Sequence, residues 1–242
     1  MLDRFRGGAG VSPTDHFDAF ISYAREPSAA LAAQLQTSLE KFAKPWNKLR
    51  AMRVFRDDQS MAANTALWST IERGLNESSH LILLVTPEAA SSEWVDKEVR
   101  WWVEHKSSGS VLLVHQAGVL DWDDAKSDFT AASAVPPSLR GAFGEEPRWV
   151  DLTSLDQAQL ADGDNPTMTN AVADLSSAVR GVDRDTIIGE NVAEHRRTMR
   201  MARGAIVGLS SRGLVGGGRA RASATKLGET RGATEPGPTS RG

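Results

Sequence analysis

The sequence predicts an α/β domain built around a parallel sheet. Short apolar segments alternate along the chain with segments whose apolar residues recur at helical spacing. One segment, Leu81 to Thr86, is continuously apolar and stops at Pro87. An apolar run of this length is typical of a central parallel strand that helices cover on both faces. The alternation of the two kinds of segment indicates repeated strand–helix–strand units with right-handed crossovers.

Each predicted element has its own signal. The helix over 29–42 follows Pro27 and Ser28, and the helix over 67–75 carries Leu67, Ile71 and Leu75 on one face. Two serines open the helix over 91–105 and can cap it. A last helix is expected over 167–179, and residues 116–147 are expected to form a long polar connection. The strands are expected at 17–22, 52–55, 81–86, 111–115 and 148–152.

The two ends of the chain differ from this central part. Residues 1–15 are predicted to be a disordered leader, 16–181 the domain, and 182–209 a helical extension. Residues 210–242 contain six basic and two acidic residues with few large apolar side chains, so a disordered basic tail is expected. Two interpretations stay open for this tail: a native basic tail, or a frame-shifted remnant that replaced a membrane segment. Membrane contact is expected only through residues 196–209.

Composition excludes several classes of protein. The net charge is −3, which does not indicate a nucleic-acid binder. The chain has no cysteine, so disulfides and thiol catalysis are excluded, and a reducing compartment is favoured. Its five histidines are scattered, and no metal site is expected. No secretory signal or membrane span is recognised, which predicts a cytoplasmic protein. A P-loop motif and a nucleophile elbow are also absent from the sequence.

Three motifs follow three of the predicted strands. They are Phe20-Ile21-Ser22-Tyr23-Ala24-Arg25, Val54-Phe55-Arg56-Asp57-Asp58, and Ser91-Ser92-Glu93-Trp94-Val95-Asp96-Lys97-Glu98. Their order and spacing resemble the TIR (Toll/interleukin receptor) domain family over about residues 15–180. The resemblance implies a flavodoxin-like fold, in which five parallel strands carry helices on both faces. Ligands of such sheets bind beyond the carboxyl ends of the strands, where all three motifs are expected.

The resemblance also implies an activity. Some TIR domains cleave NAD between nicotinamide and ribose, and some of these cyclise the product; the implied catalytic residue is Glu98, four residues after Trp94. NAD would be the substrate, with no cofactor. Tyr23 or Trp94 could stack on a ring of NAD, and Arg25 or Arg56 could pair with its pyrophosphate. Asp57 lies on the same rim or turns its loop, and Trp68 either shelters the cleft or faces the core.

One departure from the enzymatic pattern leaves a second function open. Some NAD-cleaving relatives carry an acidic residue in the loop after the second strand, and Ala62 occupies the aligned position here. Other TIR domains are adaptors without catalytic activity that act only by binding further TIR domains. Under either function, the expected partners are other TIR domains, with a homo-oligomer as the expected assembly and a role in signalling or defence.

Overall fold

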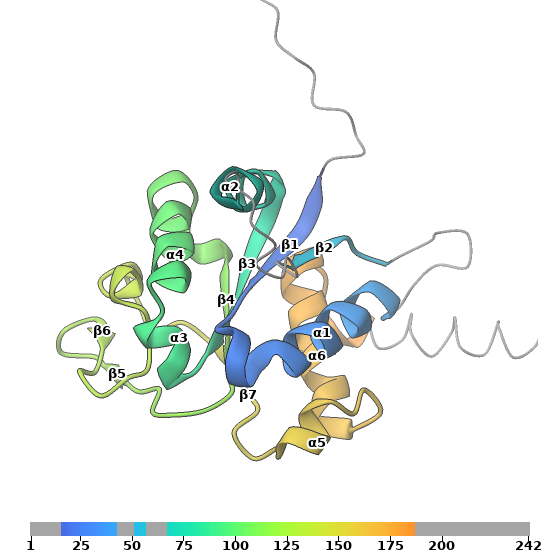
Figure 1. Cartoon of the computed structure of the whole chain (residues 1–242). Coiled ribbons are helices and arrows are strands. Elements are labelled where there is room, and N and C mark those ends of the chain that lie inside the picture. The colour runs from blue at the N-terminus through green and yellow to red at the C-terminus, as the bar shows by residue number, and fades with distance from the viewer. Residues whose placement is uncertain (1–15, 43–50, 57–66, 187–242) are drawn as a thin grey trace, which may run out of the picture. The chain divides into compact units, whose positions relative to one another are not determined.

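Five parallel strands form the central sheet of the computed structural model, which describes residues 16–42, 51–56 and 67–186 (Figure 1). The strand order is β2-β1-β3-β4-β7. Every neighbouring pair is parallel, as the sequence predicts. The bounds are β1 Phe17–Ser22, β2 Val54–Arg56, β3 Ser78–Val85, β4 Val111–His115 and β7 Trp149–Asp151.

Helices cover both faces of this sheet. On one face lie α1 (Arg25–Lys41), α5 (Gln157–Leu160) and α6 (Pro166–Arg180). On the other lie α2 (Leu67–Glu77), α3 (Pro87–Ser91) and α4 (Glu93–His105). The expected flavodoxin-like arrangement is therefore confirmed.

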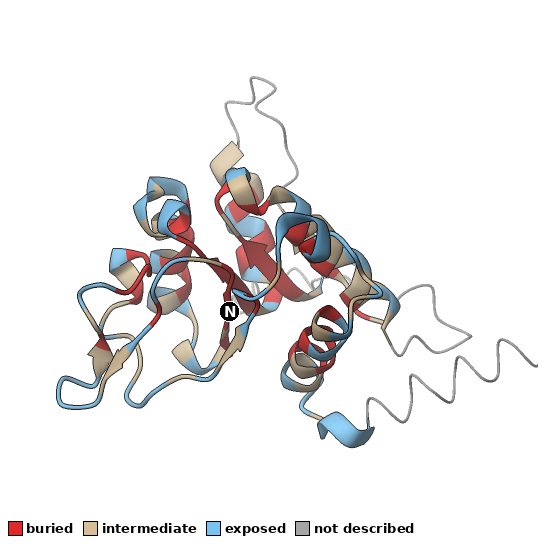
Figure 2. Ribbon diagram, turned by 90° about the horizontal axis from the view of Figure 1, so that it is seen from below, coloured by how far each residue is buried: buried red, intermediate tan, exposed pale blue. Residues whose placement is uncertain are grey.

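The apolar run predicted as the central strand is buried on both sides. Leu81, Leu83 and Val85 of β3 pack into the core under α2 and α4. Ile82 and Leu84 point the other way, into the core under α1 and α6. Side chains alternate between the two faces along a strand, and each face of β3 meets a helical layer. Figure 2 shows this burial in red along the sheet and on the inner sides of the helices.

The predicted helix over 91–105 begins two residues later in the structure. Ser91 belongs instead to α3. This helix begins at Pro87, and it is capped by Thr86, because the Thr86 hydroxyl accepts a hydrogen bond from the Ala89 N–H at 3.1 Å. Ser92 separates the two helices and accepts a hydrogen bond from the Val95 N–H at 3.3 Å. This cap starts α4 at Glu93.

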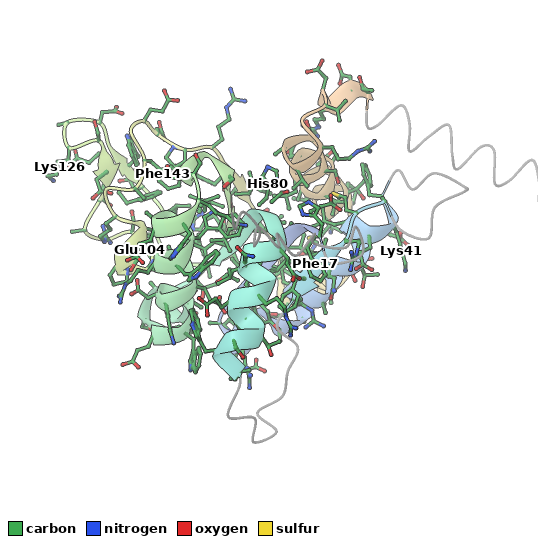
Figure 3. All side chains as sticks on the ribbon, turned by 90° about the horizontal axis from the view of Figure 1, so that it is seen from above. Phe17, Lys41, His80, Glu104, Lys126 and Phe143 are labelled. Carbon is green, nitrogen blue, oxygen red and sulfur yellow. The ribbon has the colours of Figure 1, made fainter. Side chains whose placement is uncertain are left out.

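The connection between β4 and β7 is more structured than the sequence predicts. It contains the hairpin of β5 (Trp122–Asp123) and β6 (Asp128–Phe129), with Lys126 in its turn (Figure 3), and the 3-10 helix η2 (Pro137–Leu139). A second 3-10 helix, η1 (Ser108–Ser110), precedes β4. The expectation of a merely polar connection is wrong because five of its side chains join the core under α4: Leu120, Phe129, Ala134, Val135 and Leu139.

Gly181 caps the carboxyl end of helix α6 and has a left-handed φ of 61° that suits glycine. The predicted leader over 1–15, most of the helical extension and the tail over 210–242 lie outside the described residues, as does the 196–209 segment. Within the described ranges, none of the helices has the length and apolar character needed to cross a membrane.

Candidate functional site

The strand order creates a place for a ligand at one edge of the sheet. The chain runs from β1 to β2 on one side and later from β3 outward to β4 and β7 on the other, so the order reverses between β1 and β3. Connections diverge at such a point and leave a crevice beyond the carboxyl ends of the strands. A cavity of about 210 Å³ lies here. Its lining comes from the end of β1 and the residues after it, from α2 and from α4: Ile21, Tyr23, Ala24, Arg25, Leu67, Ile71, Ser92, Trp94, Val95 and Glu98.

Glu98 brings a carboxylate into this cavity from the second turn of α4. Glu98 is only 6% exposed, and its Oε2 accepts a hydrogen bond from the Ser22 hydroxyl at 2.5 Å. Ser22 is the last residue of β1 and is itself buried. Removing a carboxylate from water is costly unless hydrogen bonds replace its hydration. The bond to Ser22 therefore helps to keep this acidic side chain inside the domain.

Trp94 lies one helical turn before Glu98, so both side chains leave the same face of α4. Trp94 is 44% exposed although it lines the cavity, and its ring centroid is 6.3 Å from that of Trp68 in α2. The Lys97 ammonium lies 3.6 Å from the Trp68 centroid and 5.4 Å from the Trp94 centroid. An aromatic pair with a cation on it thus stands beside the cavity.

Basic side chains approach the cavity from β1 and β2. Arg25 lines the cavity and is exposed to solvent. Arg56, at the end of β2, donates to the Tyr23 hydroxyl at 3.3 Å and to Gln36 Oε1 at 2.9 Å. Arg56 therefore supports the Tyr23 ring, while Tyr23 and Arg25 themselves border the cavity.

The structure brings most of the predicted site residues together. Tyr23, Arg25, Trp94 and Glu98 all line one cavity. Arg56 contacts Tyr23, and Trp68 is half-buried against both Trp94 and the core. The remaining predicted residue, Asp57, lies outside the described residues, and so does Ala62.

Sequence reasoning missed Ser22 and Lys97 as neighbours of the site. Ser22 lies inside a motif that the sequence singles out, and a hydroxyl at the carboxyl end of a predicted strand was the available signal. Lys97 looks like any lysine on a helix surface, and only the folded structure places it over the indole of Trp68.

A larger cavity, of about 530 Å³, lies at the opposite edge of the sheet between β4, β7 and α6. The charged residues there include Asp174 and Arg184, which form an ion pair at 3.1 Å. No group of three or more histidine, aspartate or glutamate side chains that could hold a metal ion occurs among the described residues. The cavity at the β1–β3 switch point is the candidate site because it combines a buried carboxylate with aromatic and basic side chains.

Comparisons with known proteins point to the same part of the chain. A family model described as TIR domain matches residues 19–161. The chain is 39% identical over 215 residues to a protein named NAD(+) hydrolase ApTIR from Actinoplanes sp. SE50/110. This match covers 88% of the chain, which spans only 30% of the length of that relative. The TIR domains of the activated Roq1 resistosome, which recognises the pathogen effector XopQ, match with a TM-score of 0.33 and 19% identity, over 40% of this chain and 56% of that one.

Proposed function

Since the chain belongs to the TIR domain family, we propose that it hydrolyses NAD at the bond between nicotinamide and ribose. The observation that carries this proposal is the buried carboxylate of Glu98 in the switch-point cavity, one helical turn from the exposed indole of Trp94. The name of the Actinoplanes relative, an NAD(+) hydrolase, supports the same activity.

One carboxylate suffices for this chemistry. When the bond between the ribose C1′ and the nicotinamide nitrogen breaks, the electron pair stays on nitrogen. The cationic pyridinium therefore leaves as neutral nicotinamide and needs no proton. Positive charge develops on the ribose, and an ionised Glu98 beside it stabilises that charge. A water oxygen then bonds to C1′ and loses a proton, which gives ADP-ribose, nicotinamide and one proton.

The other cavity residues have roles that fit their chemistry. Trp94 offers an exposed aromatic face on which a ring of NAD can stack, and Tyr23 offers a second ring, held by Arg56. Arg25 can pair with the pyrophosphate because a guanidinium makes two parallel hydrogen bonds to phosphate oxygens. In this proposal Trp68 supports the Trp94 ring.

The proposal includes association of the domain with further copies of itself. The cavity of about 210 Å³ is smaller than the roughly 300–1,000 Å³ usual for ligand pockets, and NAD is a large ligand. The rest of NAD would then extend beyond this cavity. A second copy is the proposed source of some of the residues that contact it. The cytoplasm is the proposed location, since a chain without cysteine suits a reducing compartment.

The alternative function is that of an adaptor that acts only by binding other TIR domains. Ala62, at a position that is acidic in some NAD-cleaving relatives, favours it. The two functions differ in one measurable respect, because only the enzyme releases nicotinamide.

Nicotinamide release from NAD by the purified full chain tests the proposal. We expect release whose rate per molecule rises with protein concentration, and chromatography of the product distinguishes linear from cyclic ADP-ribose. Glu98→Gln should lower the rate by at least about 100-fold. Glu104→Gln is the matched control, because Glu104 is an exposed glutamate near the other end of α4 (Figure 3). No release at any concentration, or equal rates for Glu98→Gln and the wild type, would reject the enzymatic proposal.

A further inference from the structure

The Ser22 hydroxyl and the Glu98 carboxylate form a buried contact between two parts of the chain 76 residues apart. Ser22 is 1% exposed and Glu98 is 6% exposed. We propose that Ser22 is the positioning residue for Glu98: its hydroxyl holds the carboxylate ionised and fixes its direction at the cavity. This inference rests on the proposed function, because it assigns a role in the same reaction.

Ser22 is a rigid anchor. It ends β1, a strand with a neighbour on each side: Ile21 is paired with Arg56 of β2, and Ser22 with Leu83 of β3. Glu98, in contrast, has a long side chain with several rotatable bonds, and ordering it costs conformational entropy. A hydrogen bond to a fixed strand end selects one arrangement of that side chain before substrate binds.

The direction of the bond decides which charge state it favours. The Ser22 hydroxyl donates to Glu98 Oε2, and an ionised carboxylate oxygen is a stronger acceptor than a neutral one. A donor to the charged form of an acid favours that form, and burial alone would disfavour it. The ionised form is the one that stabilises positive charge on the ribose.

A serine beside a carboxylate can also be a nucleophile that the carboxylate activates. The structure favours positioning, because Ser22 is not among the described residues that line the cavity, whereas Glu98 is. In this geometry Ser22 acts through Glu98 and does not touch the substrate.

Three titratable or charged side chains line the cavity within the described residues. They are Glu98 from α4, Tyr23 from the connection after β1, and Arg25 from the start of α1. Lys97 and Arg56 lie behind this lining, over Trp68 and against Tyr23 respectively. A substitution at Ser22 removes none of the other four side chains, so a shift in pH dependence reports on the bond to Glu98.

Steady-state kinetics of Ser22→Ala in the full chain test the inference. We expect kcat for nicotinamide release to fall by about 10- to 100-fold, the range for loss of one hydrogen bond to a charged group, while KM stays within about threefold. The acidic limb of the pH–kcat profile should move to higher pH, because the carboxylate loses a donor that favours its ionised form. Ser22→Thr keeps a hydroxyl and should restore most of kcat and the position of that limb.

Ser176→Ala is the matched control. Ser176 is also fully buried, but it lies in α6, and its hydroxyl has no hydrogen-bond partner among the described residues. Its removal should change neither kcat nor the pH profile. If Ser22→Ala behaves like Ser176→Ala, the inference is overturned.

A second measurement separates this inference from the proposed function. Urea unfolding of Ser22→Ala, Glu98→Gln and the double variant reports the coupling of the two side chains without any catalysis. Suppose that the changes in the free energy of unfolding are non-additive and that the wild type releases no nicotinamide. This result would reject the proposed function and would confirm the contact between Ser22 and Glu98. Additive midpoints together with unchanged kinetics of Ser22→Ala in an active enzyme would reject the positioning role alone.

Discussion

The ammonium group of Lys97 lies 3.6 Å from the centre of the Trp68 ring, which joins α4 to α2 beside the candidate site. A cation over an indole contributes about 0.5–1 kcal/mol at an exposed position. Lys97→Met should therefore lower the free energy of unfolding by about that amount, measured by urea denaturation. Lys97→Arg keeps a cation over the ring and should remain near the wild type. Equal loss in both variants would show that the charge on the ring is not what stabilises this contact.

Truncation of two tryptophans of α4 should affect different properties: the stability of the domain in one case and its activity in the other. Trp94 is 44% exposed and lines the cavity, whereas Trp102 is completely buried and donates from its indole N–H to the Ser110 hydroxyl at 3.1 Å. Trp102→Ala should cost about 3–5 kcal/mol of stability. Trp94→Ala should cost far less but should lower kcat/KM for NAD at least about tenfold through loss of ring stacking. Thermal unfolding and nicotinamide release, measured on both variants, check this contrast. A Trp94→Ala enzyme with wild-type kcat/KM would remove Trp94 from the substrate site.

The elements found correctly from the sequence are those whose apolar residues form a clear pattern along the chain itself. Leu81 to Thr86 predicts a doubly covered strand, and burial of Leu81 through Val85 on both faces confirms it. The hairpin of β5 and β6 has only two residues in each strand, too few for alternation to be visible. Its Phe129 enters the core through tertiary packing that no local pattern encodes.

In the candidate site, too, some features follow from local sequence patterns and others only from tertiary packing. The motifs place Tyr23 and Arg25 at a strand end and Trp94 and Glu98 on one helix face, because spacing within an element fixes direction. The bond from Ser22 to Glu98 depends on how α4 lies against β1. That relation between distant segments comes from packing, and the spacing of residues along the chain does not specify it.

The tight packing of α2 against β2 makes a specific prediction for Gly74. A glycine in a helix interior usually costs about 1 kcal/mol relative to alanine, so replacement by alanine is normally stabilising. Here a Cβ at position 74 would lie 2.9 Å from two ring carbons of Phe55. The Phe55 ring is stacked on Phe20 and meets the edge of Phe17, each with centroids 5.2 Å apart. Gly74→Ala should therefore destabilise the protein by about 1–3 kcal/mol.

Chemical denaturation of Gly74→Ala and of the double variant Gly74→Ala/Phe55→Leu provides the check. The smaller leucine makes room for the new methyl group, so the cost of the alanine should shrink in the double variant relative to Phe55→Leu alone. An alanine that stabilises the otherwise unaltered chain would contradict the close contact.

His80 should make the stability of the domain depend on pH. Its side chain lies on β3 (Figure 3), and burial lowers its pKa below the ordinary value, an effect that the nearby Asp18 only partly offsets. In the unfolded chain the histidine pKa is about 6.5, so between the lowered pKa and about 6.5 the unfolded state binds more protons than the folded state. The free energy of unfolding must then fall as the pH decreases through this window and recover as the pH rises toward 6.5. Urea midpoints between about pH 5 and 7.5 should show this slope, and His80→Gln should flatten it. His16→Gln, at an exposed histidine before β1, should preserve it. A slope that persists unchanged in His80→Gln would assign the pH dependence to other groups.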